Sequence, residues 1–343
     1  VWDLSGSPYI VRSDITVASG VTLTIKPNVT VKVNPKLHIS VSGNMIADGV
    51  NFTSSKDDGD ITTLYTSDYW TGITASGQIS CDNATIKYAS TGLYCSGSKV
   101  NLTNSTISNC QIGVNVQRTT GLNISNNTFL NNPRHIYVNI NCIGSNGLRG
   151  ISENSIAGSS SYNAIILAGD ECTSTGVITN NNNIYIIECP TIRSTLTIEP
   201  GTTLKMNTTL KVYGTLIAKG TIESPIIFTN FYDPGNGIVN TASKWGGITV
   251  VSDQYYTGDF TAENIKIMNA KGLVVNGKLS LCNSEFYECS DYAITFGTLY
   301  QPYVQFNSLY TTNGMYNINA NMIIDACYNY WNSPTGPTYY DAE

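Results

Sequence analysis

The chain has 343 residues, of which 12% are charged and 41% are hydrophobic, and its formal net charge is -6. Disorder requires low hydrophobicity with high net charge, and binding to nucleic acid requires a basic face, so both are excluded by this composition. Asn, Thr, Tyr and β-branched residues replace the Ala, Glu, Lys and Leu of long helices, which indicates an all-β chain. The chain contains no run of about 18 apolar residues, the length that a helix needs to span a membrane.

The first residues, Val1 to Ile10, lack the basic and apolar regions of a signal peptide. We therefore expect the mature form of a processed protein, or one whose anchor lies outside this chain.

The segment from Tyr9 to Thr53 predicts short strands separated by turns. It contains Leu-Thr-Ile followed by Pro (Leu23 to Pro27), a Val-rich stretch of alternating apolar and polar residues, and Gly-x-x-Ile-Ala (Gly43 to Ala47). Alternation over four to eight residues is typical of strands with one buried face.

An acidic segment follows, in which Asp57, Asp58 and Asp60 stand close together. Alternating carboxylates of this kind are candidate Ca²⁺ ligands, but the distal Glu of a complete calcium loop is missing. We expect this segment to be a solvated loop, inserted in the first half of the chain only.

A short repeat then begins, in which Asn83, Asn104 and Asn126 recur every 21 or 22 residues before a Thr and an apolar residue. Asn283 and Asn307 repeat the pattern at a spacing of 24. Such a period fits one coil of a β-helix, because a single coil cannot bury its apolar face without stacking on the next. We expect the Asn residues at turns between strands, in the left-handed conformation, with stacked amides.

The whole pattern occurs twice. Tyr185 to Thr229 matches Tyr9 to Thr53 in order, Trp245-Gly-Gly-Ile-Thr matches Trp70-Thr-Gly-Ile-Thr, and Cys289 matches Cys110. We therefore predict two copies of one module, residues 1–178 and 179–343, each a parallel β-helix with coils of about 21–25 residues, and we expect Trp70 and Trp245 in equivalent core positions.

The strings TLTIEPGTTLKM, LKVYGTLIAKGTIESPIIFT and KWGGITV, together with the ending NYWNSPTGP, carry a family resemblance. The chain resembles secreted bacterial and archaeal right-handed parallel β-helix repeat proteins of the pectate-lyase-like superfamily. That resemblance implies a right-handed solenoid in an extracytoplasmic setting, and it does not fix an activity, because the superfamily holds lyases, hydrolases, adhesins and surface components.

No catalytic set stands out. The paired carboxylates of a glycosidase and the Asn-Thr-Asp, Gly-His-Gly and Arg-Ile-Lys signatures of polygalacturonase-like enzymes are absent as a set. His38 lies in an alternating strand and His135 in a predicted turn, and neither has an acid and a nucleophile nearby in sequence. We therefore expect no enzyme, no catalytic residue and no cofactor apart from a possible Ca²⁺; a polysaccharide lyase or hydrolase is the alternative.

Cysteines and glycosylation sequons point to the extracellular side. The nine cysteines include two plausible local disulfide pairs, Cys81 with Cys95 and Cys282 with Cys289, although buried free thiols are an equal reading of any one. The candidate glycosylation sites are Asn28, Asn51, Asn83, Asn101, Asn104, Asn123, Asn126 and Asn207.

The predicted function is that of a structural or adhesive protein of the cell surface. We expect Trp70, Trp245 and Trp331 in the core, and the tyrosines of Tyr255-Tyr256 and Tyr339-Tyr340 as exposed contacts. Because no capping helix is apparent at either end, we expect copies of the chain to associate head to tail into a filament or layer. Cell-surface glycans are the other expected partner.

Overall fold

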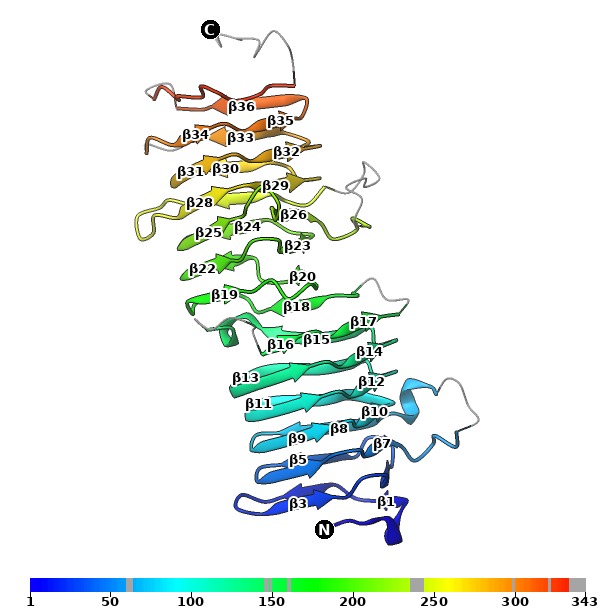
Figure 1. The fold of residues 1–343 in the computed structure, drawn as a ribbon. Coiled ribbons are helices and arrows are strands. Elements are labelled where there is room, and N and C mark those ends of the chain that lie inside the picture. The colour runs from blue at the N-terminus through cyan, green and yellow to red at the C-terminus, as the bar shows by residue number, and fades with distance from the viewer. Residues whose placement is uncertain are drawn as a thin grey trace. The chain divides into compact units, whose positions relative to one another are not determined.

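The computed structural model describes residues 1–59, 64–144, 148, 150–158, 162–234, 244–297, 300–319 and 322–332 (Figure 1). The chain is all-β, with 54% of it in strands, and its parallel sheets stack as a β-solenoid of about 13 turns. It divides into two compact units, Val1–Cys142 with Leu148–Ile166, and Ile143–Gly147 with Leu167–Glu343. The predicted all-β solenoid fold is thereby confirmed.

Three strand ladders build unit 1 (Figure 1). The first ladder is β1 (Tyr9–Val11), β4 (Thr30–Val33), β7 (Asn51–Ser54), β10 (Thr85–Lys87), β12 (Thr106–Ser108), β14 (Thr128–Leu130) and β17 (Ser155–Ala157). The second is β2 (Ile15–Val17), β5 (His38–Val41), β8 (Trp70–Ala75), β11 (Ala89–Thr103), β13 (Ile112–Ser125) and β15 (Arg134–Asn139). The third is β3 (Thr22–Ile25), β6 (Asn44–Ala47), β9 (Gln78–Asp82), the later parts of β11 and β13, and β16 (Ile151–Ser152).

Unit 2 repeats this plan with three ladders of its own. The first is β20 (Ile184–Ile187), β23 (Thr203–Met206), β26 (Ile226–Asn230), β29 (Ile265–Met268), β32 (Glu285–Tyr287) and β35 (Ser308–Tyr310). The second is β21 (Thr191–Ile192), β24 (Leu210–Val212), β27 (Ile248–Val250), β30 (Leu273–Val275), β33 (Tyr292–Phe296) and β36 (Asn313–Asn317). The third is β19 (Gly176–Ile178), β22 (Thr195–Ile198), β25 (Thr215–Lys219), β28 (Asp259–Glu263), β31 (Lys278–Cys282) and β34 (Tyr303–Gln305).

The remaining elements are short. β18 (Ile165–Ala168) lies where the chain passes from one unit to the other, and three 3-10 turns are η1 (Leu4–Gly6), η2 (Thr66–Asp68) and η3 (Ile140–Cys142). Within the described ranges no helix is long and apolar enough to cross a membrane.

Alternation along each strand produces a core of apolar residues stacked in register. In the first ladder of unit 1, Phe52 pairs with Val31 and Ile86, and all three are fully buried. In the first ladder of unit 2, Phe228 pairs with Leu204 and Ile267 in the same way. Because strands in a parallel ladder lie about 4.8 Å apart, each apolar side chain packs on the residues one coil before and one coil after.

The recurring Asn residues lie at turns, as predicted. Asn83, Asn104, Asn126 and Asn283 have φ angles of 52°, 51°, 58° and 50°, in the left-handed region that Asn tolerates. Asn307 is different, because β32 pairs with β35 through Glu285 and Ser308, which aligns Asn307 with Ser284 rather than with Asn283. The predicted equivalence of Asn283 and Asn307 is therefore wrong, because the coil advances by 23 residues at this ladder.

The residue that follows each turn forms the amide ladder. Asn127 Oδ1 accepts from the Ser105 amide at 2.9 Å, and Asn154 Oδ1 accepts from the Asn127 amide at 3.0 Å. The same arrangement joins Ser284, Asn307 and Asn329 in unit 2, at 3.0 and 2.9 Å. The stacked amides predicted for the turn residues thus belong to their buried neighbours, whose side chains are directed into the solenoid and accept from backbone amides of the adjacent coil.

Trp70 and Trp245 lie in equivalent core environments, as predicted. Both are fully buried, and each indole N–H donates to a backbone carbonyl at 2.9 Å, that of Lys87 for Trp70 and that of Met268 for Trp245. Trp331 is only half-buried, so its predicted place in the core is wrong. The predicted boundary between the two sequence modules, between residues 178 and 179, stays a prediction.

Candidate ligand-binding surfaces

The predicted acidic loop is not solvated at its first carboxylate. Asp57 is 5% exposed, and its Oδ2 accepts from Thr53 Oγ1 and pairs with Lys87 Nζ, both at 2.7 Å. Burial raises the pKa of the Asp57 carboxyl, but the hydrogen bonds from Lys87 and Thr53 outweigh burial and hold that pKa below its usual range. The expectation of a solvated loop at Asp57 is therefore wrong; Asp58 is exposed, and Asp60 lies outside the described residues.

The loop is also not confined to the first half of the chain. In unit 2, Thr229 Oγ1 donates to Asp233 Oδ2 at 2.6 Å, and Lys205 Nζ donates to the Asp233 carbonyl, as Lys32 Nζ does to the Asp57 carbonyl. The predicted insertion unique to the first module is thus wrong. The match was missed because, after the shared Phe-Thr, only the Asp four residues beyond the Thr is kept, among otherwise different residues.

The Asp57 carboxylate is already held by an ammonium group, a hydroxyl and the Gly59 amide at 3.2 Å. In the part of the chain that the structure describes, no three His, Cys, Asp or Glu side chains come together in a group that could hold a metal ion. The geometry at Asp57 is that of a structural ion pair.

All nine cysteines lie in described segments and are free thiols. The predicted pairs are not formed, since Cys81 pairs in register with Leu102 whereas Cys95 pairs with Ala75, which places the two at different points along neighbouring strands. Cys282 ends β31 and Cys289 lies beyond β32 in the next coil. Burial raises the pKa of Cys81, Cys110 and Cys289 to about 12, which makes these thiols unreactive.

Seven of the eight sequon asparagines are exposed, and Asn101 is half-buried. Asn28, Asn83, Asn104 and Asn126 lie at left-handed turns, where the side chain is directed away from the solenoid. Their glycosylation stays a prediction.

The two histidines lie apart. His38 Nδ1 is 3.1 Å from an oxygen of the exposed Asp14 carboxylate. His135 is fully buried in β15, not in a turn as predicted, and its ring nitrogens contact Asn132 at 3.3 Å and Asn163 at 3.0 Å. Desolvation lowers the pKa of His135, so the imidazole is neutral and serves the amide network of the interior.

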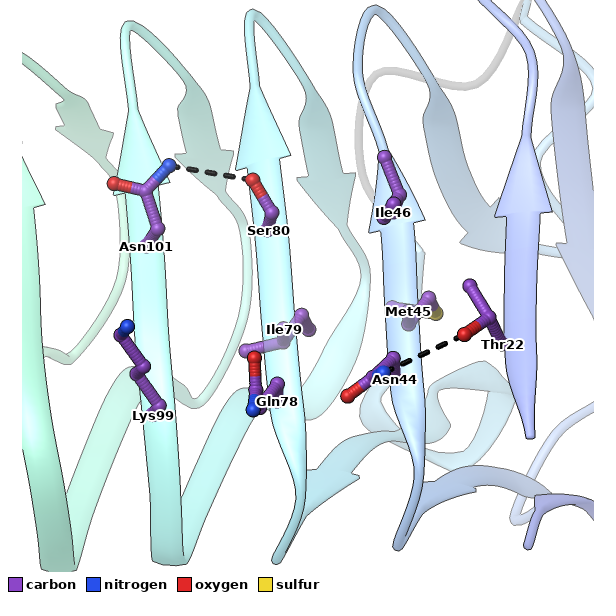
Figure 2. A pocket seen from close by; sticks show the side chains of 9 residues that line it. All are labelled: Thr22, Asn44, Met45, Ile46, Gln78, Ile79, Ser80, Lys99 and Asn101. Atoms are coloured by element: carbon purple, nitrogen blue, oxygen red, sulfur yellow. Dashed lines mark hydrogen bonds between the residues drawn. The ribbon is translucent and has the colours of Figure 1, made fainter. Parts of the chain in front are cut away.

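Mostly polar side chains project outward from the third ladder of unit 1 and form a polar surface (Figure 2). We call it the polar face and define it by eight of the outward side chains of β3, β6, β9, β11 and β13. Its members are Thr22, Asn44, Ile46, Gln78, Ser80, Lys99, Asn101 and Asn123. Figure 2 shows the first seven on adjacent parallel strands, around a depression of about 310 Å³.

Register places these side chains in two rows that run across the strands. Thr22, Asn44, Gln78 and Lys99 form one row, and Asn44 Nδ2 donates to Thr22 Oγ1 at 3.4 Å. Ile46, Ser80, Asn101 and Asn123 form the second, in which Asn123 donates to Asn101 at 2.7 Å and Asn101 to Ser80 at 3.3 Å. Lys99 is the one charged member of the polar face, and the outward carboxylate of Asp82, which ends β9 and accepts from Thr103 Oγ1 at 2.7 Å, lies two residues beyond Ser80. The polar face and this carboxylate together offer mostly amide and hydroxyl hydrogen bonds with little net charge.

Sequence reasoning selected Asn101 and Asn123 as sequons and missed the polar face. The available signal was the set of outward positions, two residues apart, in five consecutive coils; it becomes readable only once the register between strands is known.

Fold and surface together define a parallel β-solenoid with a polar face of mostly amide and hydroxyl groups. Comparisons with models of known protein families, with curated proteins and with solved structures found no significant match.

Proposed function

We propose that the chain is an extracellular, non-catalytic adhesive protein that binds a neutral glycan along the polar face. The observation that carries the proposal is the register of the two rows, which sets amide and hydroxyl groups at the strand spacing of about 4.8 Å. An extended glycan lying across the strands presents hydroxyl groups at a comparable interval, so successive sugars can meet equivalent groups.

The chemistry of the rows favours an uncharged ligand. Asn and Gln amides both donate and accept, which suits hydroxyl groups, whereas an acidic polymer would find one cation, Lys99, on a chain of net charge -6. Ile46 is 40% exposed between the polar side chains and offers an apolar contact for the face of a sugar ring.

The extracellular setting and kinship with the pectate-lyase-like superfamily are part of this proposal and rest on the sequence resemblance and the exposed sequons. Head-to-tail association of copies stays a prediction. Sedimentation of the native protein as one species of single-chain mass at all concentrations would exclude it.

The test is retention on insoluble neutral polysaccharides, such as cellulose, mannan and xylan, with the full chain at physiological salt. We expect wild type to be retained on at least one, and Asn44→Ala with Gln78→Ala to weaken binding about 10-fold, as the loss of two or more hydrogen bonds implies. Asn115→Ala is the matched control, because Asn115 lies in the second ladder of unit 1 and bonds to Gln117.

Three outcomes would overturn the proposal: no retention of wild type, equal weakening by the control, or release of soluble sugar products, which would support the enzyme alternative. Glycosylation adds a check, since glycans on Asn101 or Asn123 would cover the polar face. Native material carrying glycans at both positions should not be retained.

A further inference from the structure

Two exposed aromatic side chains occupy strained backbone positions in unit 2. Asn264, Asn283, Phe306 and Tyr328 have φ angles of 46°, 50°, 59° and 59°. Asn tolerates this left-handed conformation, whereas a bulky aromatic residue adopts it at a cost. Phe306 is 51% exposed and Tyr328 is 73% exposed, so burial does not explain them.

The two rings stack on each other at a corner of the solenoid. Their centroids are 5.1 Å apart and their planes differ by 9°. Strained residues persist where the surroundings hold them, and they gather at ligand sites. Other residues of the chain, such as Lys36 and Glu288, also have positive φ, so strain alone does not mark a site; the exposed pair does offer an aromatic surface to a ligand.

A groove of about 440 Å³ lies beside Phe306. Two carboxylates, Glu263 and Glu285, line it together with Lys266, and Ile222 and Pro225 add apolar contacts. Glu285 is occupied, because its Oε2 pairs with Lys266 Nζ and accepts from the Tyr287 hydroxyl, both at 2.8 Å.

Glu263 is less constrained. Its Oε1 accepts a long hydrogen bond of 3.5 Å from Asn283 Nδ2, and among the described residues it joins no ion pair. Lys219 is its neighbour in register on β25, but Lys219 does not line the groove.

The same unit shows how this chain completes such a site. The Arg193 guanidinium lies 4.7 Å from the Tyr213 ring centroid and 5.0 Å from that of Tyr256, and its Nε is 2.7 Å from Glu171. Lys266 likewise combines the Glu285 carboxylate with the Tyr287 ring. Each cation is shared between a carboxylate and an aromatic face.

The Glu263 carboxylate and the Phe306 ring line one groove, and Lys266 is already committed to Glu285. We propose that the Glu263–Phe306 groove binds a guanidinium or ammonium side chain from a basic peptide segment of a partner protein. A neutral sugar could also contact Phe306, but it would leave the charge of Glu263 unmatched, so the basic side chain is the better occupant.

The test is an NMR titration of the full chain with a Gly-Arg-Gly peptide amide at physiological salt, against the same peptide carrying citrulline, which keeps the shape and removes the charge. We expect the arginine peptide to bind about 10-fold more tightly. Glu263→Gln and Phe306→Asn should each weaken it by about 5- to 10-fold. Asn is chosen because it fits the left-handed turn and so preserves the fold.

Two controls separate this site from general attraction to an acidic protein. Asp291→Asn removes the same charge from an exposed position of unit 2 outside the groove, and Tyr255→Asn removes a ring that is 78% exposed. Neither should change binding. Equal affinity for arginine and citrulline, equal loss in Asp291→Asn, or binding of a neutral oligosaccharide that Glu263→Gln leaves intact would overturn the proposal; the outcome does not depend on the polar face of unit 1.

Discussion

The Asp57 and Asp233 loops are two versions of one device. In each, an Asp is almost fully buried, accepts from a Thr four residues earlier, and has a Lys on its backbone carbonyl. One difference lies beside the carboxylate: Lys87 pairs with Asp57, whereas the residue equivalent to Lys87 is Met268. The backbone carbonyl of both residues accepts from a Trp indole, and this contact is kept although the side chains differ.

This difference shows which residues of the module the solenoid requires and which can be replaced. The Trp, the Thr–Asp pair and the ladder residues satisfy buried backbone groups or fill the core, so their replacement leaves a cavity or an unsatisfied partner. Lys87 projects from a strand at the rim and is 32% exposed, so another residue is tolerated there.

The largest expected effect is removal of the equivalent tryptophans. Trp70→Ala and Trp245→Ala should each lower the free energy of unfolding by about 3–5 kcal/mol, because each leaves a large cavity and an unsatisfied carbonyl. Chemical denaturation followed by circular dichroism measures the loss. If one substitution costs less than half of the other, the two environments are not equivalent and the comparison breaks.

A smaller effect is expected from the amide ladder. Asn127→Ala and Asn307→Ala should each cost about 1–3 kcal/mol, since each removes an acceptor for a buried amide and a donor to the carbonyl of Leu102 or Leu281. Asn207→Ala changes an exposed residue that is not in the left-handed conformation and is the control. A cost for Asn127→Ala no larger than for this control would contradict the ladder.

The ion pair at Asp57 gives a further test of the difference between the two loops. Lys87→Met copies the residue of the second module and should lower the free energy of unfolding by about 1–2 kcal/mol at neutral pH. The loss is smaller than for a fully buried ion pair because Lys87 is partly exposed. Because the pKa of Asp57 is lowered in the folded state, its contribution is present above the unfolded pKa of about 3.9 and is lost as pH falls through the folded pKa.

The difference in unfolding free energy between wild type and Lys87→Met should therefore shrink below about pH 4. Met268→Leu is the control and should show no such dependence on pH. A gap between wild type and Lys87→Met that stays constant down to acid pH would exclude the ion pair as its source.

The sequence predicted the solenoid and the module alignment because both depend on repeated apolar and aromatic positions, such as Trp70 and Trp245. It misplaced Asn307 by one position, because Asn can serve either at a left-handed turn or in the buried ladder, and only strand register separates the two. For the same reason, the sequence did not predict the polar face or the Glu263–Phe306 groove. Residues such as Asn44 and Gln78 are distant in sequence and become neighbours only through pairing between coils.

The smallest effect concerns the equivalent cysteines, Cys110 and Cys289, and leaves stability unchanged. Both thiols are buried with the pKa raised to about 12, whereas Cys327 is the exposed cysteine, with its pKa raised by the neighbouring Asp325. Iodoacetamide at about pH 8 needs access and some thiolate, so it should label Cys327 first and spare Cys110 and Cys289 equally. Peptide mass mapping of the folded and the denatured protein measures this. Rapid labelling of Cys289 alone would show that the second module opens where the first does not. A pair of cysteines that stays unlabelled after denaturation without reductant would instead show that the two form a disulfide.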